Sequence, residues 1–186
     1  EIVLHLASKG WNIIIHYNSS NEQATKLEKF LNNKYPKQTF KLVKGNLSDP
    51  KETEFLIKKI VQNNGPFQLL INNASTFQEA YLKNTTSELF DTNILINLKA
   101  PFILTREFFI HCKKGEIINI TDTRITANKT NYAAYSISKK GLWELTKMAA
   151  LEFAPNIRVN AIAPGVTLPP EGKNEEYLLE LAKKTP

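Results

Sequence analysis

Tyr135 and Lys139 are the two residues whose types and spacing most directly suggest acid–base chemistry. On a helix, residues four apart lie on the same face, one turn from each other. An ammonium group beside a phenol favours the phenolate and lowers the phenol pKa, so the tyrosine can exchange a proton closer to neutral pH. The same spacing also occurs in helix-surface pairs without a function, so neighbouring motifs must decide between the two interpretations.

Asp122 is a further candidate, in a Thr-Asp-Thr-Arg segment that follows an apolar stretch and precedes Tyr135. A carboxyl group can pair with the amino and ring N–H groups of a heterocycle, or pass a proton to a ring nitrogen. Aspartate is also common at the start of a loop, which is the alternative interpretation.

The elements that must position these side chains follow from the hydrophobic pattern, in which short apolar runs alternate with segments of helical period. Continuous apolar runs are expected of parallel strands buried on both faces. The alternation predicts one α/β domain over residues 1–186, with a doubly wound parallel sheet, covered by helices. We expect strands at 12–16, 39–43, 68–71, 116–120 and 158–163, and helices at about 2–9, 24–31, 49–63, 93–112 and 132–154.

The composition argues against several classes of protein. The net charge is +6, but the basic residues are scattered among acidic ones, so we expect no nucleic-acid partner. No apolar run approaches the ~20 residues that a membrane span needs, and no signal peptide is apparent, so we expect no membrane partner. The single cysteine, Cys112, fits a reducing compartment. We therefore expect a cytoplasmic enzyme with a small-molecule substrate and no metal site.

Three motifs, in this order along the chain, resemble those of the short-chain dehydrogenase/reductase family. An Asn-Asn-Ala-Ser segment follows the third predicted strand, and Asn97 begins an Asn-Leu-Lys-Ala-Pro-Phe segment. An Arg-Val-Asn-Ala-Ile-Ala-Pro-Gly segment then follows the helix of Tyr135 and Lys139. The resemblance spans nearly the whole chain, and it implies an oxidoreductase that moves hydride between a nicotinamide dinucleotide and an organic substrate.

The resemblance implies a role for each matching residue. Tyr135 would donate the proton to the reduced substrate, and Lys139 would bind the nicotinamide ribose and tune Tyr135. Asn97 would hold a water molecule for proton relay, although an amide inside a helix can equally make a local hydrogen bond. The cofactor cleft would further be lined by Asn73, Ala74, Ser75, Pro164 and Gly165.

Asp122 stands where most of the family has serine, and this departure resembles the pteridine reductase branch. The Asn-Ala-Ser-Thr-Phe segment ending at Phe77 looks like a second feature of that branch, in which the aromatic ring stacks on the pterin. Phe77 can equally be a loop aromatic packed into the core. We expect reduction of a dihydropterin or dihydrofolate, with Phe77, Asp122 and Tyr135 against the substrate. The alternatives are a 3-oxoacyl carrier-protein reductase, which would have serine at position 122, and a non-catalytic remnant that serves as a binding module.

The expected cofactor is NADP(H). NAD-selective enzymes carry an acidic residue at the end of the second strand of this fold, which the resemblance places at 12–16. The segment after it is Tyr-Asn-Ser-Ser, whose amide and hydroxyl groups can donate to a 2′-phosphate that an acid would repel. The predicted cofactor-binding residues at this end are His16, Asn18, Ser19, Asn46 and Leu47.

The family's first strand and glycine-rich turn would come before Glu1, and its last helix and strand after Pro186. We therefore expect a fold truncated at both ends, in which the neighbours of the first strand keep unpaired edges. Residues 168–170 fall where the family has its variable substrate loop. The family often assembles through its long helices, which leaves a homo-oligomer open.

Overall fold

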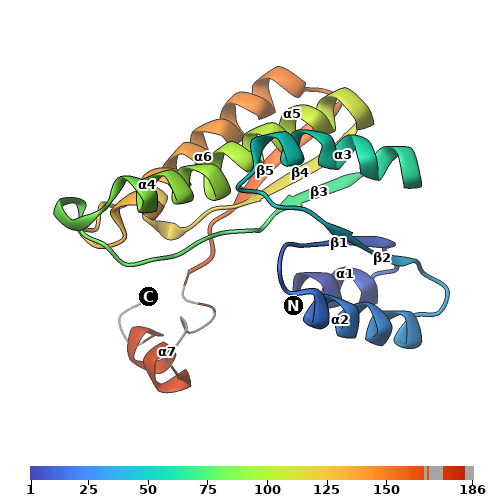
Figure 1. Cartoon of the computed structure of the whole chain (residues 1–186), viewed down its shortest axis with the longest axis horizontal. Coiled ribbons are helices and arrows are strands. Elements are labelled where there is room, and N and C mark those ends of the chain that lie inside the picture. Colours follow the sequence, from blue (N-terminus) through green and yellow to red (C-terminus); the bar gives the residue numbers. More distant parts are fainter. Residues whose placement is uncertain (166, 168–173, 183–186) are drawn as a thin grey trace.

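The computed structural model describes residues 1–165, 167 and 174–182, and within them it has an α/β architecture (Figure 1). The strands are β1 (Ile13–Tyr17), β2 (Phe40–Lys44), β3 (Leu69–Asn72), β4 (Gly115–Ile120) and β5 (Ile157–Ile162). The helices are α1 (Ile2–Ser8), α2 (Asn21–Lys34), α3 (Pro50–Asn64), α4 (Ser87–Ile94), α5 (Ala100–Cys112), α6 (Ala133–Phe153) and α7 (Glu175–Ala182). Short 3₁₀ turns span Leu82–Asn84 and Thr123–Ile125, and a π-helical turn spans Leu95–Lys99.

The strands form two parallel sheets, β1–β2 and β3–β4–β5. Figure 1 shows α1 and α2 on one side of the strands and α3, α5 and α6 on the other. The predicted fold class is therefore confirmed, and each predicted strand is present with its bounds shifted by at most one residue. The predicted substrate loop at 168–170 lies outside the described residues.

A cavity of about 720 Å³ separates the two sheets. It lies between β1 and β3, which do not pair with each other. The edges that the two strands turn toward the cavity have no strand partner among the described residues. Apolar side chains from both sheets and the helices beside them line it, among them Val3, Leu6, Ile14, Ile57, Leu70 and Leu104.

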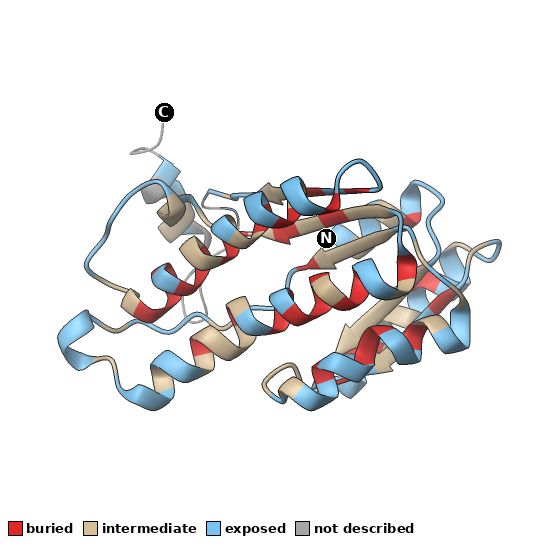
Figure 2. Ribbon diagram, turned by 90° about the horizontal axis from the view of Figure 1, so that it is seen from above, coloured by how far each residue is buried: buried red, intermediate tan, exposed pale blue. Residues whose placement is uncertain are grey.

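The main core lies between the β3–β4–β5 sheet and helices α5 and α6, whose facing sides are buried (Figure 2). Phe108, Ile117 and Ile157 are its least exposed members. Gly115 has φ 139°, and a Cβ there would lie 2.5 Å from the carbonyl oxygen of Gln68. Glycine is thus required where β4 begins against the residue that precedes β3.

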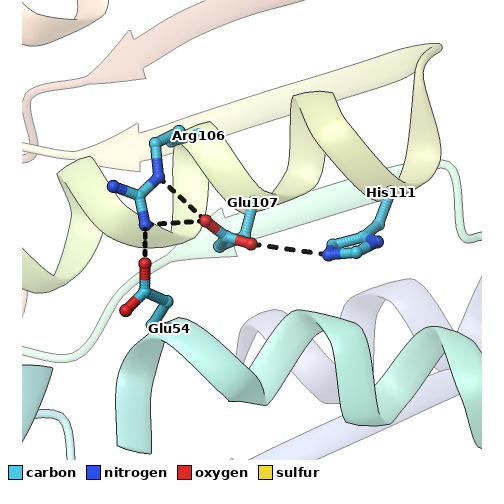
Figure 3. A network of polar contacts seen from close by, with 4 residues as sticks. All are labelled: Glu54, Arg106, Glu107 and His111. Atoms are coloured by element: carbon cyan, nitrogen blue, oxygen red, sulfur yellow. Dashed lines mark hydrogen bonds and ion pairs between the residues drawn. The ribbon is translucent and has the colours of Figure 1, made fainter. Parts of the chain in front are cut away.

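A polar network fixes α3 against α5 on the outside of this core (Figure 3). Arg106 contacts Glu54 of α3 at 2.5 Å and Glu107 at 2.8 Å, and Glu107 lies 3.4 Å from His111. The Arg106 and Glu54 side chains are 43% and 50% exposed, so their ion pair contributes little free energy. The network therefore orients the two helices, while apolar burial supplies most of the stability.

Buried amides join the carboxyl ends of β3 and β4 to α6. The Asn72 amide donates to Asn119 Oδ1 at 2.8 Å, and the Asn119 amide donates to the hydroxyl of Thr146 at 2.9 Å. The Thr146 hydroxyl in turn donates to the Leu142 carbonyl. All three polar side chains are buried, so each is costly to leave without its partner.

We predict that Asn119→Ala lowers the free energy of unfolding by about 2 kcal/mol, because it strands the Asn72 amide and the Thr146 hydroxyl in the core. Urea denaturation measures the change. The matched control is Asn63→Ala on the exposed face of α3, for which we expect a change below about 0.5 kcal/mol. Equal effects of the two substitutions would show that the buried amides are not a stabilising link.

Candidate active site

The predicted site residues follow the carboxyl ends of the strands, which parallel pairing brings to one edge. Asn18 and Ser19 follow β1, and Asn73, Ala74 and Ser75 follow β3; all five side chains are exposed. Asp122 follows β4, and Pro164 and Gly165 follow β5. This edge is where ligands bind in open α/β sheets.

Tyr135 and Asp122 meet directly at this edge. The Tyr135 hydroxyl donates a hydrogen bond to Asp122 Oδ2 at 3.0 Å. The other oxygen of Asp122 accepts the backbone N–H of Arg124 at 2.8 Å, in the turn that Asp122 caps. The carboxylate is therefore held by the backbone and presents its second oxygen to the phenol.

Lys139 lies one turn further along α6 and is 2% exposed. Its ammonium donates to the carbonyl oxygen of Ile120 at 2.7 Å, and lies 5.7 Å from the centre of the Tyr135 ring. Burial lowers the pKa of Lys139 to about 8, while the charge of Asp122 acts in the opposite direction. Lys139 thus places a cation beneath the tyrosine at the end of β4.

The pKa of Tyr135 is raised in this structure, whereas the sequence predicted a lowered value. Burial raises the pKa of Tyr135 well above its ordinary value of 10, and the charge and hydrogen bond of Asp122 raise it further. The charge that contacts the phenol is the carboxylate and not the ammonium. Tyr135 is accordingly held protonated, as a proton donor must be.

Asn97 lies in the π-helical turn and is fully buried. The predicted helix at 93–112 is in fact α4, this turn and α5, and it begins at Ser87, where the Thr86 hydroxyl caps the chain. Pro101 has no N–H, so the α-helical bond to the Asn97 carbonyl, four residues back, cannot form. The missing donor accounts for the irregular turn at this point.

The Asn97 side chain joins the loop after β3 to α6. Its oxygen accepts the Thr76 N–H at 2.8 Å and the Ser75 hydroxyl at 3.2 Å. Its amide donates to the Thr76 carbonyl at 3.0 Å and lies 3.1 Å from the Ser138 hydroxyl and 3.2 Å from Asn93 Oδ1. These contacts occupy the side chain, so its predicted role in holding a water molecule stays a prediction.

Phe77 belongs to a group of aromatic rings and is not a core residue, since it is 42% exposed. Its ring stacks on Tyr132, with the centres 4.1 Å apart and the planes inclined by 5°. The Phe77 ring also meets Tyr135 edge-on at 4.7 Å. The structure therefore brings Phe77, Asp122 and Tyr135 together, as predicted from the sequence.

Three predicted cofactor residues have internal contacts. His16 Nε2 donates to the Gly45 carbonyl at 2.9 Å, and burial lowers the pKa of His16, which keeps the ring neutral. Asn46 Oδ1 accepts the hydroxyl and the N–H of Ser48, and Leu47 packs against the apolar cluster of α3. These three residues shape the ends of β1 and β2, and the exposed Asn18 and Ser19 remain available to a ligand.

Arg124 and Tyr132 are site residues that the sequence analysis missed. The Arg124 guanidinium carbon lies 4.8 Å from the centre of the Tyr132 ring. Tyr132 precedes α6 and has φ 56°, a left-handed backbone conformation that residues other than glycine rarely adopt. Arg124 could have been found from its place two residues after Asp122, whereas nothing in the sequence signals the conformation of Tyr132.

Comparison with known proteins decides the family. The model of the short chain dehydrogenase family matches residues 1–177. The chain belongs to the short-chain dehydrogenase family. It is 29% identical over 175 residues to a short-chain type dehydrogenase/reductase of Picea abies, covering 89% of the chain and 65% of that protein. It is 31% identical to the 3-oxoacyl-[acyl-carrier-protein] reductase FabG of Staphylococcus aureus, covering 89% of the chain and 68% of FabG.

A solved structure of this family is similar along most of the chain. The FolM alternative dihydrofolate reductase 1 of Brucella canis, crystallised with NADP, is 34% identical, with a TM-score of 0.87. The alignment covers 98% of this chain and 72% of the Brucella chain. The family predicted from the motifs is thus confirmed, and the chain spans about two thirds of the length of the spruce relative. None of the described helices is long and apolar enough to cross a membrane.

We predict that Asp122→Asn lowers the pKa values of both Tyr135 and Lys139. Removing the carboxylate charge makes the phenolate easier to form and removes an attraction that favours the ammonium. The ¹³C chemical shifts of the tyrosine Cζ and the lysine Cε, followed against pH, report the two titrations. Asp91→Asn, on the exposed surface of α4, is the control and should move neither. An unchanged Lys139 titration in Asp122→Asn would contradict the electrostatic assignment.

Proposed function

We propose that the protein reduces a pteridine, a dihydropterin or a dihydrofolate, at the expense of NADPH. The observation that carries the proposal is the contact of Tyr135 with Asp122 at 3.0 Å, beside the exposed ring of Phe77. A carboxylate can accept from the amino and ring N–H groups of a pteridine, and a flat aromatic ring offers it a stacking surface. The similarity to an alternative dihydrofolate reductase supports the same substrate class.

NADP(H) fits the residues at the carboxyl edge of the strands. The amide and hydroxyl groups of Asn18 and Ser19 are exposed after β1, and no acidic residue there would repel a 2′-phosphate. Lys139 supplies a cation at the end of β4, where it can bind the nicotinamide ribose. Asn73, Ala74, Pro164 and Gly165 would border the cofactor from the loops after β3 and β5. The Brucella relative was crystallised with NADP, which supports the choice.

When bound, the cofactor supplies a hydride to the carbon of a ring C=N bond. The electron pair of that bond then moves to the nitrogen, which takes up a proton. Tyr135 holds that proton at its hydroxyl, because burial and Asp122 keep the phenol un-ionised. Asp122 fixes the direction of the hydroxyl and, through its carboxylate, the orientation of the ring. Lys139 stabilises the phenolate left behind, and water held at Asn97 can return a proton.

A carbonyl reductase is the second candidate, supported by the similarity to FabG. We expect such an enzyme to have serine at position 122, which polarises a carbonyl by hydrogen bonding. Asp122 presents an acceptor where that donor would lie, and so favours a heterocycle with N–H groups. A non-catalytic binding module is the third, and the assembled Tyr135, Lys139 and Asn97 contacts argue against it.

We predict that the full chain oxidises NADPH with 7,8-dihydrobiopterin or dihydrofolate faster than with a 3-oxoacyl thioester, and that NADH is a poorer donor. Asp122→Ala and Tyr135→Phe should each lower kcat by about 10²-fold or more, because each removes a group that directs the proton. Absorbance at 340 nm follows the reaction.

Binding of NADPH, measured by its fluorescence, should survive both substitutions and shows that the variants are folded. The control is Asp91→Ala on α4, which should keep full activity. Turnover of the thioester alone would replace the pteridine assignment by carbonyl reduction. If NADPH binds and no substrate is turned over, the protein is a binding module.

We further propose a cytoplasmic homo-oligomer that assembles through α5 and α6. The single cysteine supports a reducing compartment. The outward faces of the two helices carry large exposed apolar side chains, including Phe102 at 51%, Met148 at 67% and Leu151 at 84%. Such side chains are enriched where subunits meet.

We predict that Leu151→Glu shifts the protein to a smaller assembly in sedimentation velocity, because a buried unpaired charge would be left in the interface. Leu179→Glu on α7, also exposed at 64%, is the matched control and should leave the assembly unchanged. A monomeric wild-type protein would refute the oligomer.

A further inference from the structure

Arg124 lies beside the proposed substrate position, and no described carboxylate forms an ion pair with it. The chain has three arginines. Arg106 contacts Glu54 and Glu107, and Arg158 contacts Glu116 at 2.8 Å. Among the side chains that the structure describes, those of residues 1–165, 167, 174, 176–180 and 182, Arg124 has no ion pair within 4.0 Å. A half-buried guanidinium in a ligand-binding edge with no internal anion is unusual, because its five N–H donors call for acceptors.

The guanidinium is nonetheless held in one place. It stacks on the Tyr132 ring at 4.8 Å, and its Nη1 donates to Asn131 Oδ1 at 3.1 Å. The Asn131 amide is in turn fixed by Glu79 at 3.2 Å. Nη1 also donates to the Asn131 main-chain carbonyl at 3.5 Å. The contacts of Nη1 and the ring face satisfy part of the guanidinium and leave the N–H groups of Nε and Nη2 for a ligand. The position is thus preorganised, which lowers the entropy cost of binding.

The same group of side chains connects Arg124 to the reacting groups. Tyr132 contacts both Arg124 and Phe77, and the Phe77 ring meets Tyr135. Asp122, whose carboxylate accepts from Tyr135, also accepts the backbone N–H of Arg124. A ring bound against Phe77 and Asp122 would therefore direct any substituent past the guanidinium. The charge of Arg124 is felt at Tyr135, where it lowers the pKa against the larger opposing effects of burial and Asp122.

We propose that Arg124 is a specificity-determining residue that binds a carboxylate on the substituent of the substrate. The inference rests on the proposed pteridine reduction and deepens it: the substrates preferred are those with an acidic tail, such as a dihydrofolate. A planar guanidinium matches a carboxylate with two parallel hydrogen bonds, which a neutral side chain on the pteridine cannot form. Among the described residues, Asp122 is engaged with Tyr135 and Glu79 with Asn131.

The test compares dihydrofolate with its dimethyl ester, which keeps the size of the tail and removes its two charges. For the wild-type full chain we expect kcat/KM about tenfold or more higher for the acid than for the ester, mainly through KM. Arg124→Gln should abolish this preference by raising KM for the acid alone. KM for the ester and for 7,8-dihydrobiopterin, whose side chain is neutral, should change by less than about twofold, so the acid-to-ester ratio of kcat/KM is the readout.

Arg158→Gln, which removes the same charge from the exposed end of β5, is the matched control and should keep the preference. Asn131→Ala frees the guanidinium without removing it, and should lower the preference by a smaller factor. A merely structural role of Arg124 would lower turnover of acid and ester alike, and that result overturns the inference. Equal kcat/KM of acid and ester in the wild type overturns it while the proposed function stands. Absence of turnover with every pteridine overturns both.

Discussion

The buried amide of Asn97 is the contact on which the geometry of the active-site edge depends. It joins the loop after β3, through Ser75 and Thr76, to Ser138 of α6. Tyr135 and Lys139 lie on α6 within one turn of Ser138. The contact of the Asn97 amide with Ser138 therefore sets their distance from the end of β3. An unmet donor or acceptor at a fully buried position would cost about 1–3 kcal/mol, which makes this geometry hard to exchange for another.

Close packing of the backbone reinforces the same link. A Cβ on Gly141 would lie 2.7 Å from Leu98 Cδ2, so a larger residue there would displace the Leu98 side chain of the π-helical turn. That turn is irregular because Pro101 cannot donate to the Asn97 carbonyl. Pro101 and Gly141 therefore act at the same contact. Pro101 interrupts the helical hydrogen bonding at Asn97, and Gly141 leaves room for the turn against α6. The energy lost in helical hydrogen bonding is offset by the contacts of the Asn97 side chain.

Much of the fold could be predicted from the sequence, because it depends on local pattern. The apolar runs place every strand to within one residue. Pro101 also indicates an irregular helix at Asn97, which the sequence analysis did not predict. Contacts within the site were harder to foresee. The spacing of Tyr135 and Lys139 fixes their common face, but not which charge contacts the phenol; that depends on the turn in which the backbone of Arg124 holds Asp122. The left-handed Tyr132 depends likewise on stacking with Phe77, which is distant in the chain.

The residues proposed for proton transfer and those proposed for the choice of cofactor are positioned by different sheets. Asp122, Tyr135, Lys139 and Asn97 are fixed by hydrogen bonds among the β3–β4–β5 sheet, its loops and α6, without any contribution from β1 or β2. Asn18 and Ser19, proposed to contact the 2′-phosphate, follow β1 of the other sheet. The proposal therefore implies that changes after β1 alter the choice of dinucleotide while Asp122, Tyr135 and Lys139 keep their contacts. The contacts that hold the Tyr135 phenol at the end of β4 do not involve the β1–β2 sheet. Changes in that sheet therefore need not move the phenol.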